Sequence, residues 1–416
     1  MVYRIRPALS TGVAWRTTPT VPVTSDQISE IAKVTSGALP AIITGIGARA
    51  LAVPCVTPYH WRSGRQDGIN VTLITVETTL GVKGFGEATL DHPQSVIACV
   101  EAITPHLLGR AAGNVEAIVR AIMAHGRWRH TPRFTNAVVA GIESACWDAW
   151  GKALGLPASA FFGGPVRDVV DFFGFPQGDS AAELAAAARA LTGDGSTVIY
   201  IKVGREDLEE DVQVVKEVRA AIGPNARLRV DANGAWDVPT AIDQIDKMAA
   251  FNIDWVEQPV DLQNISGLAQ VRRSVKPKIA ADQAVYSIGD LRAVLESEAA
   301  DVIVLGHHES GGLWRLRQMA QIAEAHGVPL NRHGTLETSI STYAALQVLA
   351  CIPNLTSGNQ IMHQLLTTDL TEPPLALAAG KASIPEAPGL GFTLSTAAVD
   401  ECARRFKLDG PYPPSS

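Results

Sequence analysis

From about residue 166 the chain alternates short apolar runs with longer amphipathic segments. The apolar runs are VVDFFGF, TVIYIKV, RLRVDAN, IDWVEQP, KIAADQ, DVIVLG, VPLNRHG and LTSGNQ. The segments between them can each hold a helix, as LEEDVQVVKEVRAAIG and LWRLRQMAQIAEAHG illustrate with their helical spacing of apolar residues. Eight strands separated by seven helical segments predict an α/β fold, a modified TIM barrel of (β/α)7β type, over residues 166–385.

The part of the chain before this barrel has a different pattern. Residues 41–90 alternate β-branched residues with turn residues, which predicts an antiparallel hairpin or meander. Residues 93–165 are helical in pattern, with apolar residues at i, i+3, i+4 and i+7 in TNAVVAGIESACWDAWGKALG. Together these segments predict an α+β capping domain over 41–165, and we expect the tail, 386–416, to fold back and complete it.

Composition narrows the class of protein. The 416 residues carry a net charge of −7 without a long basic run, which argues against nucleic acid as a partner. The five cysteines form no CxxC pair, as is typical of a reduced, cytoplasmic protein. The apolar stretch 37–56 is interrupted by Pro40, Arg49 and Pro54, so we expect a loop and a strand there and no membrane span. Residues 1–40 are interpreted as an N-terminal extension, a surface arm or oligomer contact, and we expect a homo-oligomer.

Acidic residues end three successive predicted strands. Asp231, Glu257 and Asp282 lie 26 and 25 residues apart, close to the spacing of about 30 residues for one βα unit of such a barrel. The carboxyl ends of the strands meet at one mouth, so these side chains should converge there. Converging anions repel each other unless a cation lies among them, and all-oxygen ligation suits a hard cation such as Mg²⁺. The spacing therefore predicts a magnesium-dependent enzyme.

Basic residues occur at other strand ends in the same frame. Lys202 ends the strand before Asp231, and His333 ends the strand VPLNRH near the end of the barrel. His307 and His308 follow the intervening strand DVIVLG. A basic group on each side of a metal is what proton transfer beside a metal-bound carboxylate requires.

At this point the chain resembles the enolase superfamily, in its mandelate racemase and glucarate dehydratase-like branch. The motifs that carry the resemblance are VDANGAW, VEQP, AADQ, IKVG, RHG and APGLGF in the barrel and tail, with GFGEA and GIESACWDAWGKALG in the capping domain. The resemblance implies that the three acids bind Mg²⁺, that the metal holds a substrate carboxylate, and that a base removes the adjacent α-proton to give an enediolate. Lys202 matches the second lysine of the family's Lys-x-Lys motif, the base on one face. His333 matches the histidine on the opposite face.

The chain departs from the family pattern at two positions. Tyr200 stands where the first lysine is expected, and it should point into the site because residues two apart in a strand face the same way. Gly306 stands where an aspartate usually orients the histidine. His307, His308 or Glu309 are the candidates to take that role.

Further residues are candidates for substrate binding. They are Tyr200, Asn233, His307, His308, Glu337, His60 and Arg62, the last two in a loop that would close over the barrel. Each has an ordinary structural alternative: an ion pair at the barrel rim, a packed histidine, a turn residue or a solvated loop.

The expected substrate is a small-molecule carboxylate, and the first hypothesis is dehydration of an acid sugar to a 2-keto-3-deoxy acid. Lys202 would abstract the α-proton, and His333 would protonate the departing β-hydroxyl. The alternative is a racemase, epimerase or cycloisomerase acting through the same enediolate. A hypothesis of another class, a barrel that has lost catalysis and only binds or regulates, conflicts with the presence of the three acids together with Lys202 and His333.

Overall fold

The computed structural model describes residues 41–61, 64–90, 92–128 and 132–413, which lie in one compact unit of the chain. The predicted extension, 1–40, lies outside the described residues. Six parallel strands form one sheet in sequence order. They are β5 (Val198–Lys202), β6 (Arg227–Asp231), β7 (Ile253–Glu257), β8 (Lys278–Ala281), β9 (Val302–Val304) and β10 (Leu330–Asn331).

Two further segments close this sheet into a ring. Residues 172–174 occupy the position of the first barrel strand, and residues 355–359 occupy the position of the eighth. The closing bridges are parallel and pair Gly174 with Ile199, Phe172 with Asn359, and Leu355 with Leu330. The barrel of eight strand positions expected from the apolar runs is thereby confirmed.

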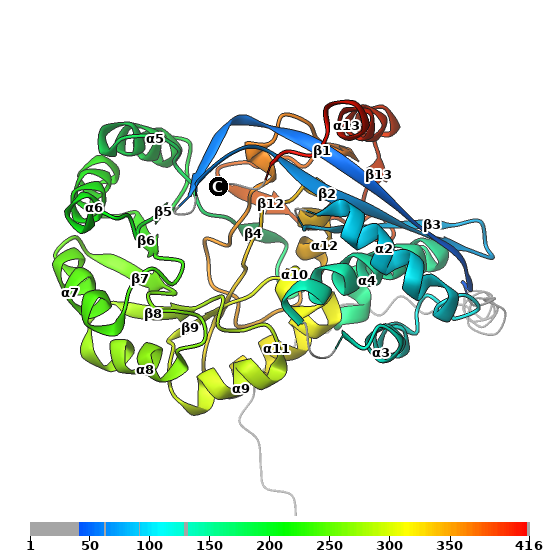
Figure 1. Ribbon diagram of the computed structural model, residues 1–416, viewed down its shortest axis with the longest axis horizontal. Helices are drawn as coiled ribbons and strands as arrows, with labels where there is room; N and C mark the ends of the chain where they lie inside the picture. The colour runs from blue at the N-terminus through cyan, green and yellow to red at the C-terminus, as the bar shows by residue number, and fades with distance from the viewer. Residues whose placement is uncertain (1–40, 62–63, 91, 129–131, 414–416) are drawn as a thin grey trace, which may run out of the picture. The chain divides into compact units, whose positions relative to one another are not determined.

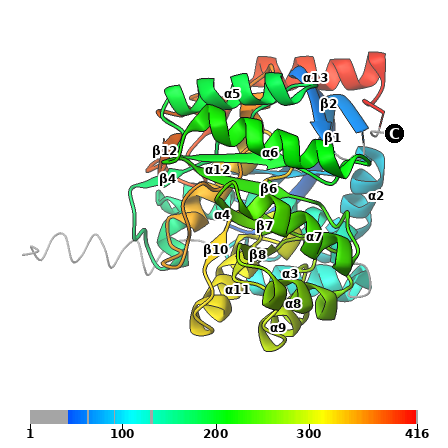
Figure 2. The same ribbon diagram turned by 90° about the vertical axis from the view of Figure 1, so that its left-hand side faces the viewer.

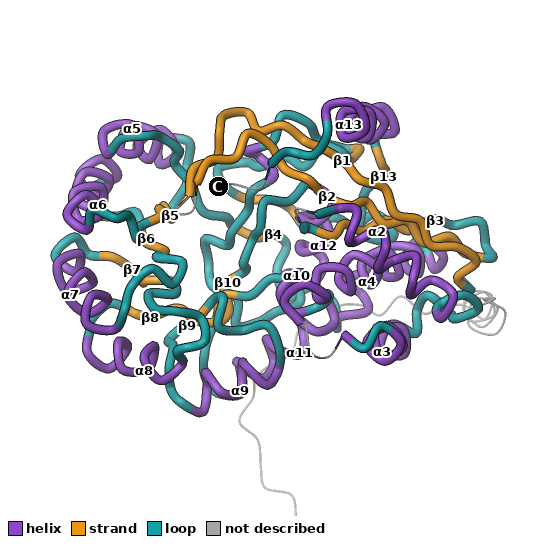
Figure 3. The backbone as a smooth tube through the Cα atoms, viewed as in Figure 1, coloured by secondary structure: helices purple, strands orange, loops and turns teal. Residues whose placement is uncertain are grey.

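Helices connect consecutive strand positions of the barrel and surround it, as Figures 1 and 3 show. They are α5 (Ala181–Gly193), α6 (Leu208–Ile222), α7 (Val238–Ala249), α8 (Ile265–Ser274), α9 (Ile288–Glu296), α10 (His307–Ser310), α11 (Leu313–Ala325) and α12 (Ser339–Leu349). Several begin at a polar residue whose side chain accepts a backbone N–H of the first turn, namely Ser180, Asp207, Asp237, Asn264, Ser287 and Thr338. In the second view α5, α6 and α7 face the reader in front of the strands (Figure 2).

The capping part is an antiparallel sheet backed by helices. Its strands are β1 (Ile43–Trp61), β2 (Gly64–Thr78) and β3 (Lys83–Ala88), and its helices are α2 (Pro93–Ile103), α3 (Val115–His125) and α4 (Pro132–Leu154), with short turns η1 (Thr104–His106) and η3 (Ala158–Phe162). The glycines of GFGEA let β3 approach α4 closely. A Cβ on Gly84 would collide with the carbonyl of Ala145, and one on Gly86 with the carbonyl of Gly141.

The C-terminal segments return to both parts. They are η4 (His363–Leu365), β11 (Thr371–Glu372), β12 (Lys381–Ser383), β13 (Thr393–Leu394) and α13 (Thr396–Asp409), and β12 pairs with the short strand β4 (Val169–Asp171). Helix α13 lies along β1, where Arg49 Nη1 is 2.7 Å from Asp400 Oδ1. Helix α13 of the tail thus packs on β1 of the capping sheet. Among the described residues, no helix is long and apolar enough to cross a membrane.

Buried carboxylates of the capping part bind the first turns of barrel helices. Glu87 of β3 accepts the backbone N–H of Thr338, the N-cap of α12, at 3.0 Å. Glu143 of α4 accepts the backbone N–H groups of Leu313 and Trp314 in α11, at 2.8 and 2.9 Å. Burial raises the pKa of both carboxyls to about 7. These two side chains tie the cap to the barrel.

Stability should depend on pH through Glu87. Its pKa is about 7 in the folded protein against an ordinary 4.5, so folding favours the protonated form. Its stabilising contribution is fully present below pH 4.5 and is lost as the pH rises through 7. Between pH 4.5 and 8 the unsubstituted protein should lose up to about 3 kcal/mol of its free energy of unfolding through this group. Glu87→Gln should not show this loss, because its side chain does not titrate. Urea denaturation of both proteins at several pH values measures this difference, with the exposed Glu116→Gln as control. Parallel pH profiles would show that Glu87 does not titrate in this range.

Candidate active site at the barrel mouth

The three acids meet at the carboxyl ends of adjacent strands. Asp231 and Glu257 are the last residues of β6 and β7 and pair in register, and Asp282 directly follows β8. All three are buried, with at most 2% of their surface exposed. The sequence prediction therefore placed these carboxylates correctly at one mouth.

Burial and mutual repulsion govern the charge of this cluster. Burial raises the pKa of Glu257 to about 8, and the neighbouring Asp231 and Asp282 add to the effect. Burial likewise raises the pKa of Asp282 to about 7, although His333 opposes it. Glu257 Oε2 and Asp282 Oδ2 are buried without a hydrogen-bond partner among the described residues. Unsatisfied buried oxygens of this kind are what a hard divalent cation would bind.

The donor set therefore fits Mg²⁺ in its chemistry. Within the described ranges, however, no three acidic, histidine or cysteine side chains are already gathered in a geometry that would hold a metal. Asp231 instead turns its Oδ2 to three donors, Lys202 Nζ at 2.5 Å, the Tyr200 hydroxyl at 2.6 Å and Asn233 Nδ2 at 2.9 Å. Lys202 therefore supplies positive charge to this cluster.

Lys202 ends β5 beside Asp231 and is mostly buried. Burial alone would lower the pKa of its ammonium, but the charges of Asp231 and Glu257 outweigh it, and the pKa lies above the usual value. Lys202 is thus held as an ammonium ion against Asp231, with its Nζ 5.3 Å from the centre of the Tyr200 ring.

Tyr200 and Asn233 face the acids directly. The Tyr200 hydroxyl lies 2.6 Å from Asp231 Oδ2 and 2.9 Å from Glu257 Oε1. Since a hydroxyl has one proton, it can donate to only one of these oxygens at a time. Asn233, at a positive φ of 46°, also donates its backbone N–H to Asp231 at 2.8 Å. Both residues bind proposed metal ligands in this structure, and their contact with substrate stays a prediction.

His333 has a carboxylate partner from an unexpected place. Its Nδ1 lies 3.0 Å from Glu309 Oε1 and 3.6 Å from Asp282 Oδ1. Burial would lower the pKa of His333, but these two acids raise it to about 10. The Glu309 carboxylate also fills the space of the absent side chain at Gly306, because a Cβ there would collide with Glu309 Oε2. Of the three candidates left open by the sequence, Glu309 is the one whose side chain faces His333 Nδ1.

The two adjacent histidines are packed in α10. His307 and His308 are buried, and their ring centroids lie 4.0 Å apart. Burial lowers the pKa of both, that of His308 to about 4, so both are neutral near pH 7. The second histidine shares a hydrogen bond of 2.9 Å with the Ser341 hydroxyl. These positions give them a structural role in the described protein, and substrate contact stays a prediction for both.

The other predicted contacts divide into two cases. Glu337 is buried and forms an ion pair with the buried Arg332 through Oε1, while its Oε2 is buried without a hydrogen-bond partner among the described residues. The side chain of His60 and the whole of Arg62 lie outside the described residues, and their predicted role in the closing loop stays untested.

An aromatic cluster at the mouth was missed by the sequence analysis. Phe173 stacks on the Tyr200 ring at a centroid distance of 4.7 Å, and Phe175 lies 5.9 Å from the same ring. Tyr59 of β1 packs on Phe175 at 5.8 Å, and Met362 joins them. The signal was present in the run FFGF, where residues 173 and 175 must face the same way.

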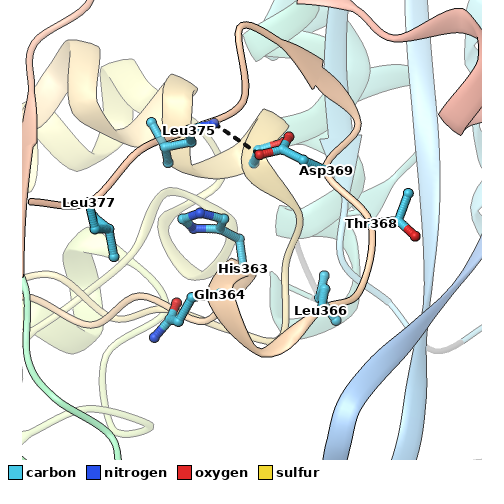
Figure 4. Close-up of a pocket in the computed structure, with 8 residues that line it drawn as sticks. His363, Gln364, Leu366, Thr368, Asp369, Leu375 and Leu377 are labelled. Carbon is cyan, nitrogen blue, oxygen red and sulfur yellow. Dashed lines mark hydrogen bonds between the residues drawn. The ribbon is translucent and has the colours of Figure 1, made fainter. Parts of the chain in front are cut away.

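A separate pocket with a volume of about 230 Å³ is formed by residues around η4 and the start of α12 (Figure 4). Its lining consists of Ser339, His363, Gln364, Leu366, Thr368, Asp369, Leu375 and Leu377. Asp369 already accepts the backbone N–H groups of Leu375 at 2.9 Å and Thr371 at 3.0 Å. The residues predicted for catalysis do not line this pocket, so the candidate active site is the barrel mouth.

Removing the Glu309 charge should change the titration of His333. We expect Glu309→Gln to lower the pKa of His333 by about one unit or more, because one of its two anionic neighbours is lost. NMR titration of the histidine ring signals, with the His333 signal identified through His333→Asn, measures this pKa. The exposed Glu324→Gln in α11 is the control. An unchanged pKa would mean that Asp282 alone sets the charge of His333.

Comparison with known proteins agrees with this geometry. Residues 46–163 match the model of the mandelate racemase / muconate lactonizing enzyme N-terminal domain, and residues 183–398 match that of the enolase C-terminal domain-like family. Muconate cycloisomerase 1 from Pseudomonas putida is 33% identical over 80% of this chain and 91% of its own length.

Relatives with other activities are also similar. The L-Ala-D/L-Glu epimerase of Bacillus subtilis is 28% identical over 84% of this chain and 96% of its own. A probable glucarate dehydratase of Streptomyces coelicolor is 28% identical over 81% of this chain and 85% of its own. A crystal structure of muconate lactonizing enzyme from Pseudomonas fluorescens, complexed with muconolactone, has a TM-score of 0.82 at 27% identity and covers 88% of this chain and 100% of that one.

Proposed function

The chain belongs to the mandelate racemase and muconate lactonizing enzyme family of the enolase superfamily, and we propose that it is an isomerase that moves the proton α to a substrate carboxylate. The observation that carries the proposal is the placement of Lys202 and His333 on opposite sides of the three acids. Each is held there by a carboxylate, Lys202 by Asp231 and His333 by Glu309. Enzymes of this family act on small carboxylates.

The proposed cofactor is Mg²⁺, which Asp231, Glu257 and Asp282 would hold. When bound, the cation takes the substrate carboxylate and offsets the negative charge that develops on it as the α-proton leaves. The superfamily pairs such a metal with a lysine or histidine base. The unsatisfied oxygens Glu257 Oε2 and Asp282 Oδ2 support this assignment.

The residues of the chain move and hold the proton. Lys202 Nζ is the proposed acceptor on one face of the α-carbon, in the neutral form that a cation bound by Asp231 would favour by repelling the ammonium charge. His333 is the proposed donor or acceptor on the other face. The ion pair with Glu309 lies on the Nδ1 side of His333, so we assign the proton exchange to Nε2. Both side chains are largely shielded, with exposed fractions of 17% for Lys202 and 16% for His333. Shielding from water strengthens the electrostatic interactions on which such proton transfer depends.

Isomerisation is favoured over dehydration because both faces are equipped for reversible proton transfer. The glycine at position 306 suggested a histidine without an orienting acid, and Glu309 supplies that acid. The cycloisomerase and epimerase relatives support the same choice. Racemisation, epimerisation and cycloisomerisation all use this arrangement.

Dehydration of an acid sugar to a 2-keto-3-deoxy acid is the second candidate. It is favoured by the raised pKa of His333, which keeps a proton available for a departing hydroxyl. The similarity to a probable glucarate dehydratase points the same way.

Exchange of the substrate α-proton in deuterated water tests the shared chemistry. With Mg²⁺ present, we expect exchange that EDTA abolishes. Lys202→Ala and His333→Asn should each slow exchange by about 100-fold or more for one α-configuration, since each removes the base on one face. The exposed Lys216→Ala is the matched control. Proton NMR measures the exchange, and undiminished exchange in both site variants would overturn the assignment.

The product separates the two candidates. Isomerisation returns a proton to carbon or closes a ring and yields no new keto group, whereas dehydration yields a 2-keto acid that semicarbazide detects. Formation of that semicarbazone with an acid sugar, at the rate of α-proton loss, would replace the isomerase by the dehydratase.

A further inference from the structure

The turn that follows Lys202 is held by a buried carboxylate of the next helix. Residues 203–205 leave the end of β5, and the backbone N–H groups of Gly204 and Arg205 lie 2.7 and 3.1 Å from Asp211 Oδ2. Asp211 belongs to the first turn of α6 and is fully buried. Its carboxylate therefore fixes the backbone directly after the proposed base.

The other oxygen of this carboxylate binds an arginine that reaches back to Lys202. Arg205 Nη1 lies 2.7 Å from Asp211 Oδ1 and 3.2 Å from the backbone carbonyl oxygen of Lys202. This guanidinium nitrogen carries two protons, so it can donate to both oxygens at once. Arg205 also pairs through Nε with the exposed Glu210 at 3.3 Å and lines an open pocket of about 680 Å³. The buried Asp211 is therefore the contact that brings the guanidinium to Lys202.

The same turn packs closely on the segment that follows Asp231. Gly204 has a φ of 94°, and a Cβ on it would lie 2.6 Å from the Cβ of Ala235 and 3.0 Å from the carbonyl oxygen of Ala232. The backbone N–H of Val203 donates to the carbonyl oxygen of Asp231 at 2.8 Å. Close packing and the hydrogen bonds to Asp211 together fix the turn relative to a proposed metal ligand.

Separate contacts hold the other proposed proton carrier. Gly334, next to His333, donates its backbone N–H to Gln360 Oε1 at 3.1 Å, and His333 Nδ1 faces Glu309. Glu309 follows β9 and Gln360 follows the eighth strand position, so neither belongs to the α6 region. Loss of Asp211 should therefore disturb Lys202 and spare His333.

We propose that Asp211, acting through Arg205, is a positioning residue for Lys202. This inference rests on the proposed function, in which Lys202 Nζ takes the α-proton on one face. A lysine side chain is long and flexible, so Nζ lies accurately at a reacting carbon only if both ends of the side chain are held. Asp231 holds the ammonium end, and the Asp211–Arg205 pair holds the backbone carbonyl at the other end.

Acetylation of lysines by acetic anhydride, followed by mass spectrometry of the peptides, tests the position of Lys202 without a substrate. Lys152 is the matched reference in the same full-length protein, because its side chain is 20% exposed and pairs with a buried carboxylate, against 17% for Lys202. In Mg²⁺ buffer, we expect Asp211→Asn to raise the labelling rate of Lys202 several-fold relative to that of Lys152. The amide keeps only one acceptor oxygen, and its NH₂ group opposes the remaining donor.

Two further variants keep this test decisive. Arg205→Met retains the buried Asp211 and should raise the relative labelling of Lys202 in the same way, even if Asp211→Asn does not fold. Glu209→Gln removes a carboxylate from the same turn of α6, where it pairs with Lys247, and should leave the ratio unchanged. An unchanged ratio in Arg205→Met and Asp211→Asn, or equal acceleration of both lysines, overturns the proposal and leaves Asp211 a purely structural role.

The α-proton exchange experiment gives a second readout. Asp211→Asn should slow exchange by about tenfold or more for the α-configuration that depends on Lys202, because misplacement of the base raises the barrier. Exchange of the configuration that depends on His333 should change little, and equal slowing of both would overturn the proposal. If the unsubstituted protein exchanges neither configuration, the proposed function fails, while the labelling ratio still decides whether Asp211 positions Lys202.

Discussion

Repulsion among three buried carboxylates is the constraint on which the rest of the site depends. Asp231, Glu257 and Asp282 are brought together by strand register, and burial raises the cost of their charge. Cationic side chains and hydrogen-bond donors surround the cluster and reduce this repulsion. Lys202 and His333 supply positive charge, Gln360 donates to Glu257 Oε1 at 2.9 Å, and the Tyr200 hydroxyl is shared between Glu257 and Asp231. The groups proposed for proton transfer are therefore the same groups that offset the repulsion among the three acids.

The cap is attached to the barrel by buried carboxylates that each accept hydrogen bonds from the barrel. There, buried carboxylates meet backbone N–H groups at helix N-termini, where negative charge is stabilised. Glu143 on the start of α11 and Glu87 on the start of α12 fix the cap beside the segments that carry Glu309 and His333. Because β1 belongs to this cap, the same attachment places Tyr59 against Phe175 at the mouth.

The features that could be predicted from the sequence are those encoded locally. The eight strand positions of the barrel, and the three acids at the ends of β6, β7 and β8, follow from the spacing of apolar runs, and the structure confirms both. Glu309 was left among three candidates because it lies beyond its strand end, in a helical turn whose direction the local pattern does not specify. The Phe173 and Phe175 cluster was missed because an apolar run looks the same whether its side chains face the barrel interior or the helices. The pairing of Glu337 with Arg332 depends on how the chain turns after β10, which spacing alone does not define.

Tyr200 contacts both the acids and the aromatic cluster, and this explains why it can stand where a lysine is typical. Its hydroxyl lies between Asp231 and Glu257, so it provides a donor to the acids without a second ammonium. Its ring stacks on Phe173 with an interplanar angle of 7°, which a lysine side chain could not reproduce. The substitution thus removes one positive charge from the Lys202 side and adds an aromatic surface there. With Glu309 in place of the missing acid on the His333 side, both groups proposed for proton transfer keep a carboxylate partner, while the surface beside Lys202 becomes aromatic.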